Sequence, residues 1–140
     1  MSVLKDFLIE NSDVINKEVE VAVSSRFKDK DGNLLKFKIK PMSGDEFGKY
    51  QKQCTTITFN NRKRETNFDT GKFNLMCIVN HCTDPSFKDA DLLKELGVQT
   101  PEQAVSKTLL AGEIVELGSQ ISSISGFDTD INEEIEKAKN

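Results

Sequence analysis

Apolar and polar residues alternate along two stretches in the first third of the chain. Val19, Val21 and Val23 alternate with charged or small residues, and from Leu35 to Pro41 the apolar side chains alternate with lysines. A period of two buries one face of a β-strand. We therefore expect strands near 18–27 and 35–41.

The segment between these stretches predicts a hairpin turn. A two-residue Asp31-Gly32 turn would place valines and lysines on the same face, so the burial patterns of the two strands would conflict. A three-residue loop, Lys30-Asp31-Gly32, instead pairs Val23 with Ile39 and puts glycine where the loop needs a left-handed residue. We expect the three-residue loop.

Helical patterns dominate after about residue 69, with one helix before it. A capping box at Ser43-Gly44-Asp45-Glu46 begins the early helix, and Asp69 or Thr70 precedes an apolar segment at 71–81. Ser86-Phe87-Lys88-Asp89 begins a short helix that Gly97 ends. Later helices begin at Thr100-Pro101-Glu102-Gln103 and, at the end of the chain, at Asp130. A further helix is expected at about 112–125, ending at Gly126. The 71–81 helix is apolar over most of its circumference, which predicts a central, buried position.

These elements predict an α+β fold. The hairpin (about 18–27 and 35–41) should pack against a bundle of four to six short helices, and residues 55–68 should form either a β-arm or a loop. The length of 140 residues favours a single domain over 1–140.

Charge and cysteine content narrow the function classes. The net charge is −4, and the longest basic run is Arg62-Lys63-Arg64, so we expect no nucleic-acid binding. Three cysteines in a chain with no export signal indicate reduced thiols. Since no stretch of 18 apolar residues is present either, we expect a cytoplasmic protein that does not bind a membrane.

Candidate chemistry is confined to one cluster. Cys77, His81 and Cys82 are close in sequence, and Cys54 would have to complete a zinc site. Their spacing matches no common structural zinc site, and a cysteine on the most apolar helix should be buried and unreactive. The simpler interpretation is a buried helix that ends in a partly exposed His81. Without a glycine-rich phosphate loop or a second histidine, we expect no enzyme activity and no cofactor.

Many short stretches together resemble a known family. They are residues 24–33 (Ser-Ser-Arg-Phe-Lys-Asp-Lys-Asp-Gly-Asn) with 36–41, Phe68-Asp69-Thr70, Asp84-Pro85 with 87–92, Leu109-Leu110-Ala111-Gly112-Glu113, and 124–133. The chain resembles, over essentially its whole length, the tail assembly chaperones of contractile-tailed phages and defective prophages of Gram-positive bacteria.

The resemblance implies a binding role in the cytoplasm of a bacterial host. Such chaperones are thought to bind the tape measure protein and keep it soluble while the tail tube assembles, with the tail tube protein as a further partner. A structural tail or baseplate component retained in the particle is the alternative, and a small Cys/His metal-binding protein is a more distant one.

The resemblance supplies no binding residues, so physical chemistry has to suggest them. A partner for amphipathic helices needs an exposed apolar stripe or groove. The expected helix at 112–125 and its flanks carry such a stripe, whose members are Leu110, Ile114, Leu117, Ile121, Ile124 and Phe127. The same residues could instead pack on the domain's own core, or mediate self-association.

Overall fold

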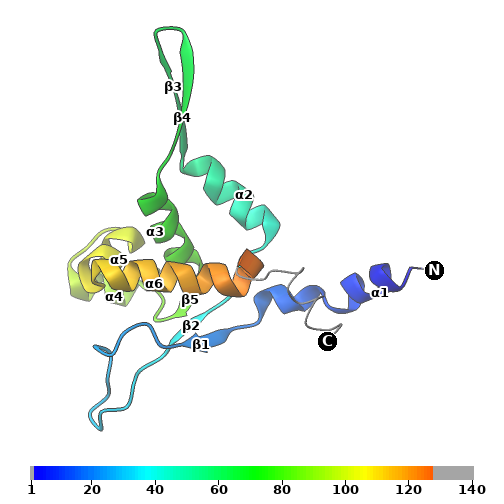
Figure 1. The fold of residues 1–140 in the computed structure, drawn as a ribbon. Helices are drawn as coiled ribbons and strands as arrows, with labels where there is room; N and C mark the ends of the chain where they lie inside the picture. The colour runs from blue at the N-terminus through cyan, green and yellow to red at the C-terminus, as the bar shows by residue number, and fades with distance from the viewer. Residues whose placement is uncertain (1, 128–140) are drawn as a thin grey trace, which may run out of the picture.

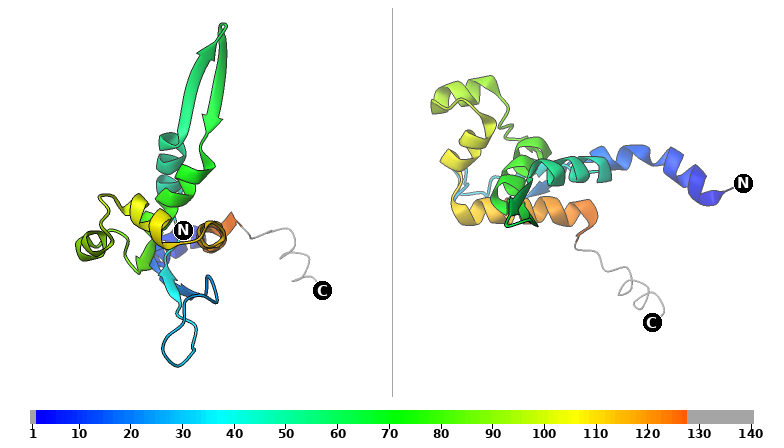
Figure 2. Two further views of the ribbon diagram at one scale, coloured as in Figure 1. Left: turned by 90° about the vertical axis from the view of Figure 1, so that its left-hand side faces the viewer. Right: turned by 90° about the horizontal axis from the view of Figure 1, so that it is seen from above.

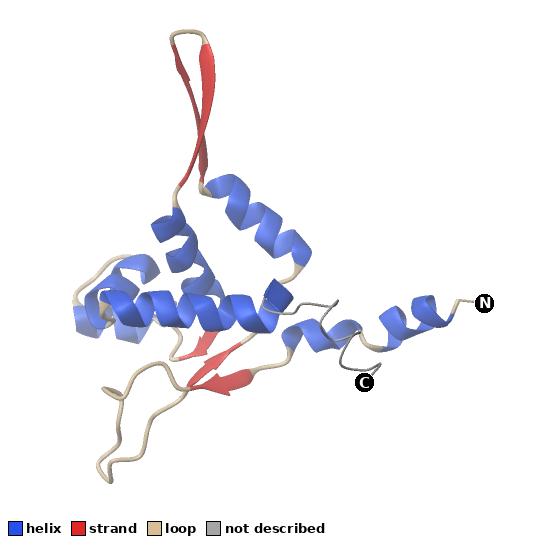
Figure 3. Ribbon diagram, viewed as in Figure 1, coloured by secondary structure: helices blue, strands red, loops and turns tan. Residues whose placement is uncertain are grey.

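The computed structural model describes residues 2–127 (Figure 1). Within this range the chain forms an α+β fold, as the sequence predicts, with six α-helices and two small antiparallel sheets (Figure 3). The helices are α1 (Val3–Glu10), α2 (Gly44–Gln53), α3 (Thr70–His81), α4 (Ala90–Leu96), α5 (Pro101–Thr108) and α6 (Ala111–Ser122). The strands are β1 (Val19–Val21), β2 (Phe37–Ile39) and β5 (Cys82–Asp84) in one sheet, and β3 (Thr55–Asn60) and β4 (Lys63–Phe68) in the other.

Helix α3 lies at the centre of the core. It begins where the Asp69 side chain accepts a hydrogen bond from the Lys72 backbone N–H at 3.0 Å. Helix α6 crosses it, α2 and α5 contact it, and the sheet of β1, β2 and β5 lies beyond its C-terminal end (Figures 1 and 2). Its buried residues are Cys77, Ile78, Val79 and His81. The prediction of a central, buried helix is confirmed.

The N-terminal hairpin is shorter than predicted, and its register changes along its length. Near the tip, Lys28 pairs with Leu34 and Gly32 has a φ of +85°, as the three-residue loop requires. In the sheet, however, Val19 pairs with Ile39, whereas the predicted register paired Val23 with Ile39. The predicted strands at 18–27 and 35–41 are therefore wrong in extent: only three residues of each are paired in the sheet.

A wide loop at 22–36 explains this change. Its first part leaves the ladder so that the Phe27 ring can pack edge-on against Phe37, with ring centroids 5.0 Å apart. The shift is four residues, an even number, so Val19 and Val21 remain on the same face as Phe37 and Ile39. Alternation thus predicts which side chains share a face even where it predicts the wrong partners, and on that face Phe37 and Ile39 are buried.

Residues 55–68 form a β-hairpin, here called the arm, rather than a loop. Strands β3 and β4 pair from Thr55 with Phe68 to Asn60 with Lys63. Asn61 and Arg62 form the two-residue turn, and both have positive φ values, 52° and 67°, as the type I′ turn of a tight hairpin requires. The arm projects away from the helices (Figures 1 and 2).

The remaining helices begin close to the predicted positions. Capping boxes start α2 at Ser43 and α5 at Thr100, and Gly97 ends α4 in a left-handed conformation. The predicted 112–125 helix is α6 followed by a π-helical turn at Ser123–Phe127. The expected helix after Asp130 lies outside the described residues. Helix α1 and strand β5 were not predicted.

An ion pair ties the wide loop to α6. The Arg26 guanidinium donates through Nε and Nη2 to the two carboxylate oxygens of Glu113, at 3.0 and 2.7 Å, and Nη2 also donates to the Thr108 carbonyl at 2.8 Å. The Glu113 carboxylate in turn accepts the Leu110 backbone N–H at 2.8 Å. The Arg26–Glu113 pair therefore joins the loop, the end of α5 and the start of α6.

Two leucines of the predicted stripe along α6 should respond differently to truncation. Leu117 is fully buried, whereas Leu110 is 61% exposed. We expect Leu117→Ala to lower the free energy of unfolding by about 2–5 kcal/mol, because it leaves a cavity in the core. Leu110→Ala should change it by less than about 0.5 kcal/mol. Urea denaturation of the two variants measures both; equal effects would contradict the packing of α6.

The Arg26–Glu113 pair should make stability depend on acid pH. The hydrogen bonds from Arg26 lower the pKa of Glu113 from 4.5 to about 2. Since the folded pKa lies below the unfolded one, the carboxylate stabilises the fold fully above pH 4.5, and this contribution is lost as the pH falls towards 2.

We therefore expect Glu113→Gln to be less stable than the unaltered protein at neutral pH, and the difference to shrink as the pH falls. Thermal unfolding between neutral pH and about pH 2 measures this. Arg26→Met should show the same pH dependence, and the double variant should be no worse than either single one. If the stability difference between Glu113→Gln and the unaltered protein is unchanged at low pH, the ion pair is not its cause.

Candidate protein-binding site

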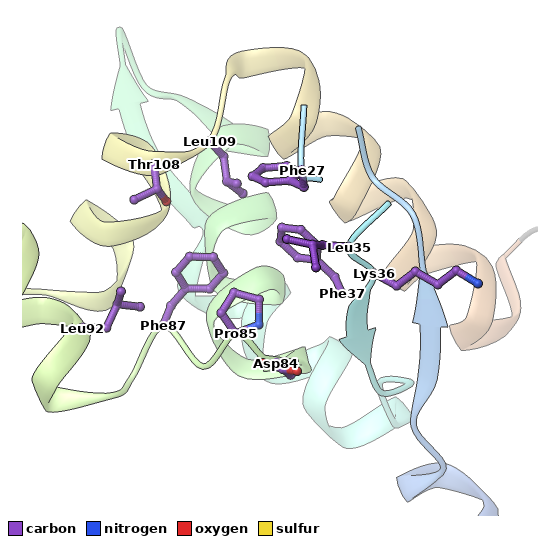
Figure 4. A pocket seen from close by; sticks show the side chains of 10 residues that line it. All are labelled: Phe27, Leu35, Lys36, Phe37, Asp84, Pro85, Phe87, Leu92, Thr108 and Leu109. Carbon is purple, nitrogen blue, oxygen red and sulfur yellow. The ribbon is translucent and has the colours of Figure 1, made fainter. Parts of the chain in front are cut away.

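An open apolar pocket lies where the wide loop, the sheet and the α4–α5 region meet (Figure 4). Its cavity volume is about 360 Å³. The residues that line it are Phe27, Leu35, Lys36, Phe37, Asp84, Pro85, Phe87, Leu92, Thr108 and Leu109. These residues are hereafter called the apolar pocket.

Each wall of the pocket comes from a different part of the chain. Phe27 and Leu35 come from the wide loop, Phe37 from β2, Phe87 from the turn after β5, and Leu109 from the end of α5. The walls at Phe37, Phe87 and Leu109 are buried in the core, whereas Leu35 is about half exposed at the mouth. The pocket is thus a continuation of the core that is open to solvent on one side.

The position of the Phe27 wall depends on its neighbour Arg26. The Arg26 guanidinium lies 4.6 Å from the centre of the Phe27 ring while it pairs with Glu113. The ion pair thus fixes the part of the loop that carries Phe27. In the view of Figure 4 the Lys36 side chain extends away from the aromatic groups.

The lining of this pocket suits the binding of apolar groups. Its surface is mostly aromatic and aliphatic, with the charged groups of Lys36 and Asp84 as the ionisable exceptions. A pocket of this kind buries apolar side chains of a partner, which is how anchor residues contribute most of the affinity at protein interfaces. We take it as the candidate binding site.

The six residues predicted from the sequence as a partner-binding stripe lie in three environments. Leu117 and Ile121 are fully buried in the core, and Ile114 and Ile124 are half-buried against it. Only Leu110 and Phe127 are well exposed. The centroid of the Phe127 ring lies 5.0 Å from the centroid of the Phe47 ring. The structure therefore does not bring the six together as one exposed stripe.

His81 is fully buried, which corrects the prediction that it would be partly exposed. Strand β5 follows it directly, so the end of α3 is covered by the sheet and does not reach the surface. Its Nε2 lies 2.9 Å from the Tyr50 hydroxyl and 3.7 Å from a carboxylate oxygen of Glu46. Burial lowers the pKa of His81 and raises that of Tyr50 to about 12, so both side chains are neutral at pH 7.

The three cysteines are buried free thiols. Desolvation raises the pKa of Cys77 and of Cys82 to about 12, so neither is a thiolate at pH 7. Across residues 2–127, no three His, Cys, Asp or Glu side chains are grouped so that they could hold a metal ion. The predicted burial of Cys77 is confirmed.

Two further apolar surfaces were missed by the sequence analysis. The arm exposes Ile57, Phe59 and Phe68, and α1 exposes five apolar side chains. For α1 the signal was present in the sequence, because Ser2 can cap a helix whose apolar residues recur at 3, 4, 7 and 8. Among the described helices, none has both the length and the apolar character to cross a membrane.

Comparisons with known proteins place this architecture in a family. The sequence profile of the family described as "Phage XkdN-like tail assembly chaperone protein, TAC" matches residues 4–139. The "Phage-like element PBSX protein XkdN" of Bacillus subtilis (strain 168) is 26% identical over 136 residues, which cover 96% of this chain and 92% of that protein.

A second relative has a solved structure. The "Uncharacterized protein YqbN" of the same Bacillus subtilis strain is 29% identical over 136 residues, covering 96% of this chain and 91% of the relative. A crystal structure of YqbN superposes with a TM-score of 0.63 at 27% identity, covering 79% of this chain and 86% of that one. Because the family profile spans nearly the whole sequence, the chain belongs to the XkdN-like family of phage tail assembly chaperones.

Proposed function

We propose that this protein binds the tape measure protein in the cytoplasm of the bacterial host and keeps it soluble while the tail tube assembles. The observation that carries the proposal is the apolar pocket, which leaves core-like side chains open to solvent in a member of a tail assembly chaperone family. It requires no cofactor and no catalytic group.

The pocket suits the apolar face of an amphipathic helix. A cavity of about 360 Å³ can take one or two large apolar side chains, which on a helix would be three or four residues apart. Leu110 directly follows the pocket residue Leu109 and is exposed, so it can extend the contact along the start of α6. Phe127, at the other end of α6, is a second candidate contact.

Co-expression with the tape measure protein tests this function. We expect the tape measure protein to be soluble when the chaperone is present and insoluble without it. Leu35→Asp should lower the affinity for the tape measure protein by about tenfold or more, because it places a charge at the mouth of the apolar pocket. The soluble fraction and a pull-down measure the two effects.

Val115→Asp is the matched control. Val115 is an exposed apolar residue of α6 that does not line the pocket, so the same change in charge should leave binding unaltered. Leu110→Asp tests separately whether the start of α6 takes part. A tape measure protein that stays insoluble with the chaperone would contradict the proposal, and recovery of this protein in purified phage particles would favour a structural tail component.

A further inference from the structure

Helix α1 exposes more apolar surface than its own molecule covers. None of its residues, Val3 to Glu10, is buried, and its exposed apolar side chains are Val3, Leu4, Phe7, Leu8 and Ile9. Val3 and Phe7 are four residues apart, and so are Leu4 and Leu8. These four side chains therefore form two rows on one side of the helix. Asp6 and Glu10, also four residues apart, follow one edge of this apolar side.

The arm carries a matching surface of opposite charge. Residues directly opposite in an antiparallel pair share a face, so Ile57 lies with Thr66, and Phe59 lies with Arg64. Phe59 is 76% exposed, although it is one of the largest apolar side chains of the protein. One face of the arm therefore presents Ile57 and Phe59 of β3 beside Arg64, near the start of β4.

Both elements need a partner surface to be stable. Helices as short as eight residues are marginal in water, and so is an isolated two-stranded hairpin. The two leave the rest of the molecule in different directions, and α1 is followed by a strand fixed in the three-stranded sheet (Figures 1 and 2). The arm of the same molecule is therefore out of reach of α1 in this arrangement.

The geometry points to the arm of a second copy as the surface on which α1 docks. The apolar side of α1 would cover Ile57 and Phe59, and its acidic edge would lie along Arg64. The charges agree, since residues 2–13 carry three acids against one base and residues 55–68 carry three bases against one acid. The lengths are compatible, because eight helical residues span about 12 Å and fit within a six-residue strand of about 20 Å.

This contact joins two different surfaces, so it does not close on itself in a pair of copies. In a pair of copies, one copy keeps a free arm and the other keeps a free α1. Further copies can therefore bind at both ends of the pair. The contact uses neither Leu35 nor the other pocket residues, so association leaves the apolar pocket of every copy open. Association through α1 and the arm does not depend on binding of the tape measure protein, so either proposal can fail without the other.

Mixing two defective variants tests the contact. Phe59→Ser removes the arm surface, and Leu4→Ser with Leu8→Ser removes the helix surface; both changes lie outside the core. We expect the unaltered protein to grow in mass with concentration in sedimentation velocity, and each variant alone to associate at least about tenfold more weakly. The mixture should form a complex of two copies that grows no further, since each variant supplies the surface that the other lacks.

A charge exchange tests the orientation. Arg64→Glu should weaken association about tenfold by repelling the acidic edge of α1, and Glu10→Lys in the same chain should restore it. Lys63→Glu is the matched control, because Lys63 alternates with Arg64 and lies on the opposite face of the arm. A monomer at all concentrations, a mixture that forms no complex, or association that Leu35→Asp abolishes and Phe59→Ser does not, would each overturn the inference.

Discussion

The burial of the C-terminal half of α3 is the constraint on which the rest of the structure depends. Ile78 and His81 are inaccessible to solvent, and Cys77 is nearly so. A helix that is apolar over most of its surface must be covered on every side, which is why α2, α5, α6 and the three-stranded sheet surround it. His81 is buried together with these apolar residues, and it stays neutral with Tyr50 as its hydrogen-bond partner.

A core organised around one short helix does not enclose all of the apolar side chains of the chain. The wide loop carries Leu35 to the mouth of the pocket, the arm carries Phe59 away from the helices, and α1 carries Phe7 in another direction. Exposed apolar patches of this kind often mark surfaces that bind other proteins. The same architecture that limits the core thus leaves apolar surfaces exposed, and membership of a tail assembly chaperone family agrees with this.

The separation of these surfaces has a physical consequence for a chaperone. One pocket of this size contributes limited affinity, but several copies held together on a long partner would bind with a much higher effective concentration. The Arg26–Glu113 pair matters in this context because it holds the loop that forms one wall of the pocket. A mobile loop would lose conformational entropy on binding and so lower the affinity.

Local signals in the sequence determined most of the elements and little of their arrangement. Ser43, Asp69 and Thr100 start helices because their side chains satisfy free backbone N–H groups within three residues, a property that needs no tertiary context. The alternation around Phe37 and Ile39 likewise specified which strand face is buried. It could not specify the pairing, because the path of the loop also depends on Arg26 reaching Glu113, which lies far along the chain.

Tertiary structure alone decided which apolar residues became core and which became surface. On α6 the pattern could not separate Leu117, which is buried in the core, from Leu110, which lies at the N-terminal cap of that helix and is 61% exposed. The pocket is equally invisible in the sequence, since its walls come from segments as far apart as Phe27 and Leu109. Periodicity reports that a side chain is apolar and on which face it lies, but only the packing of distant segments determines whether that face is covered.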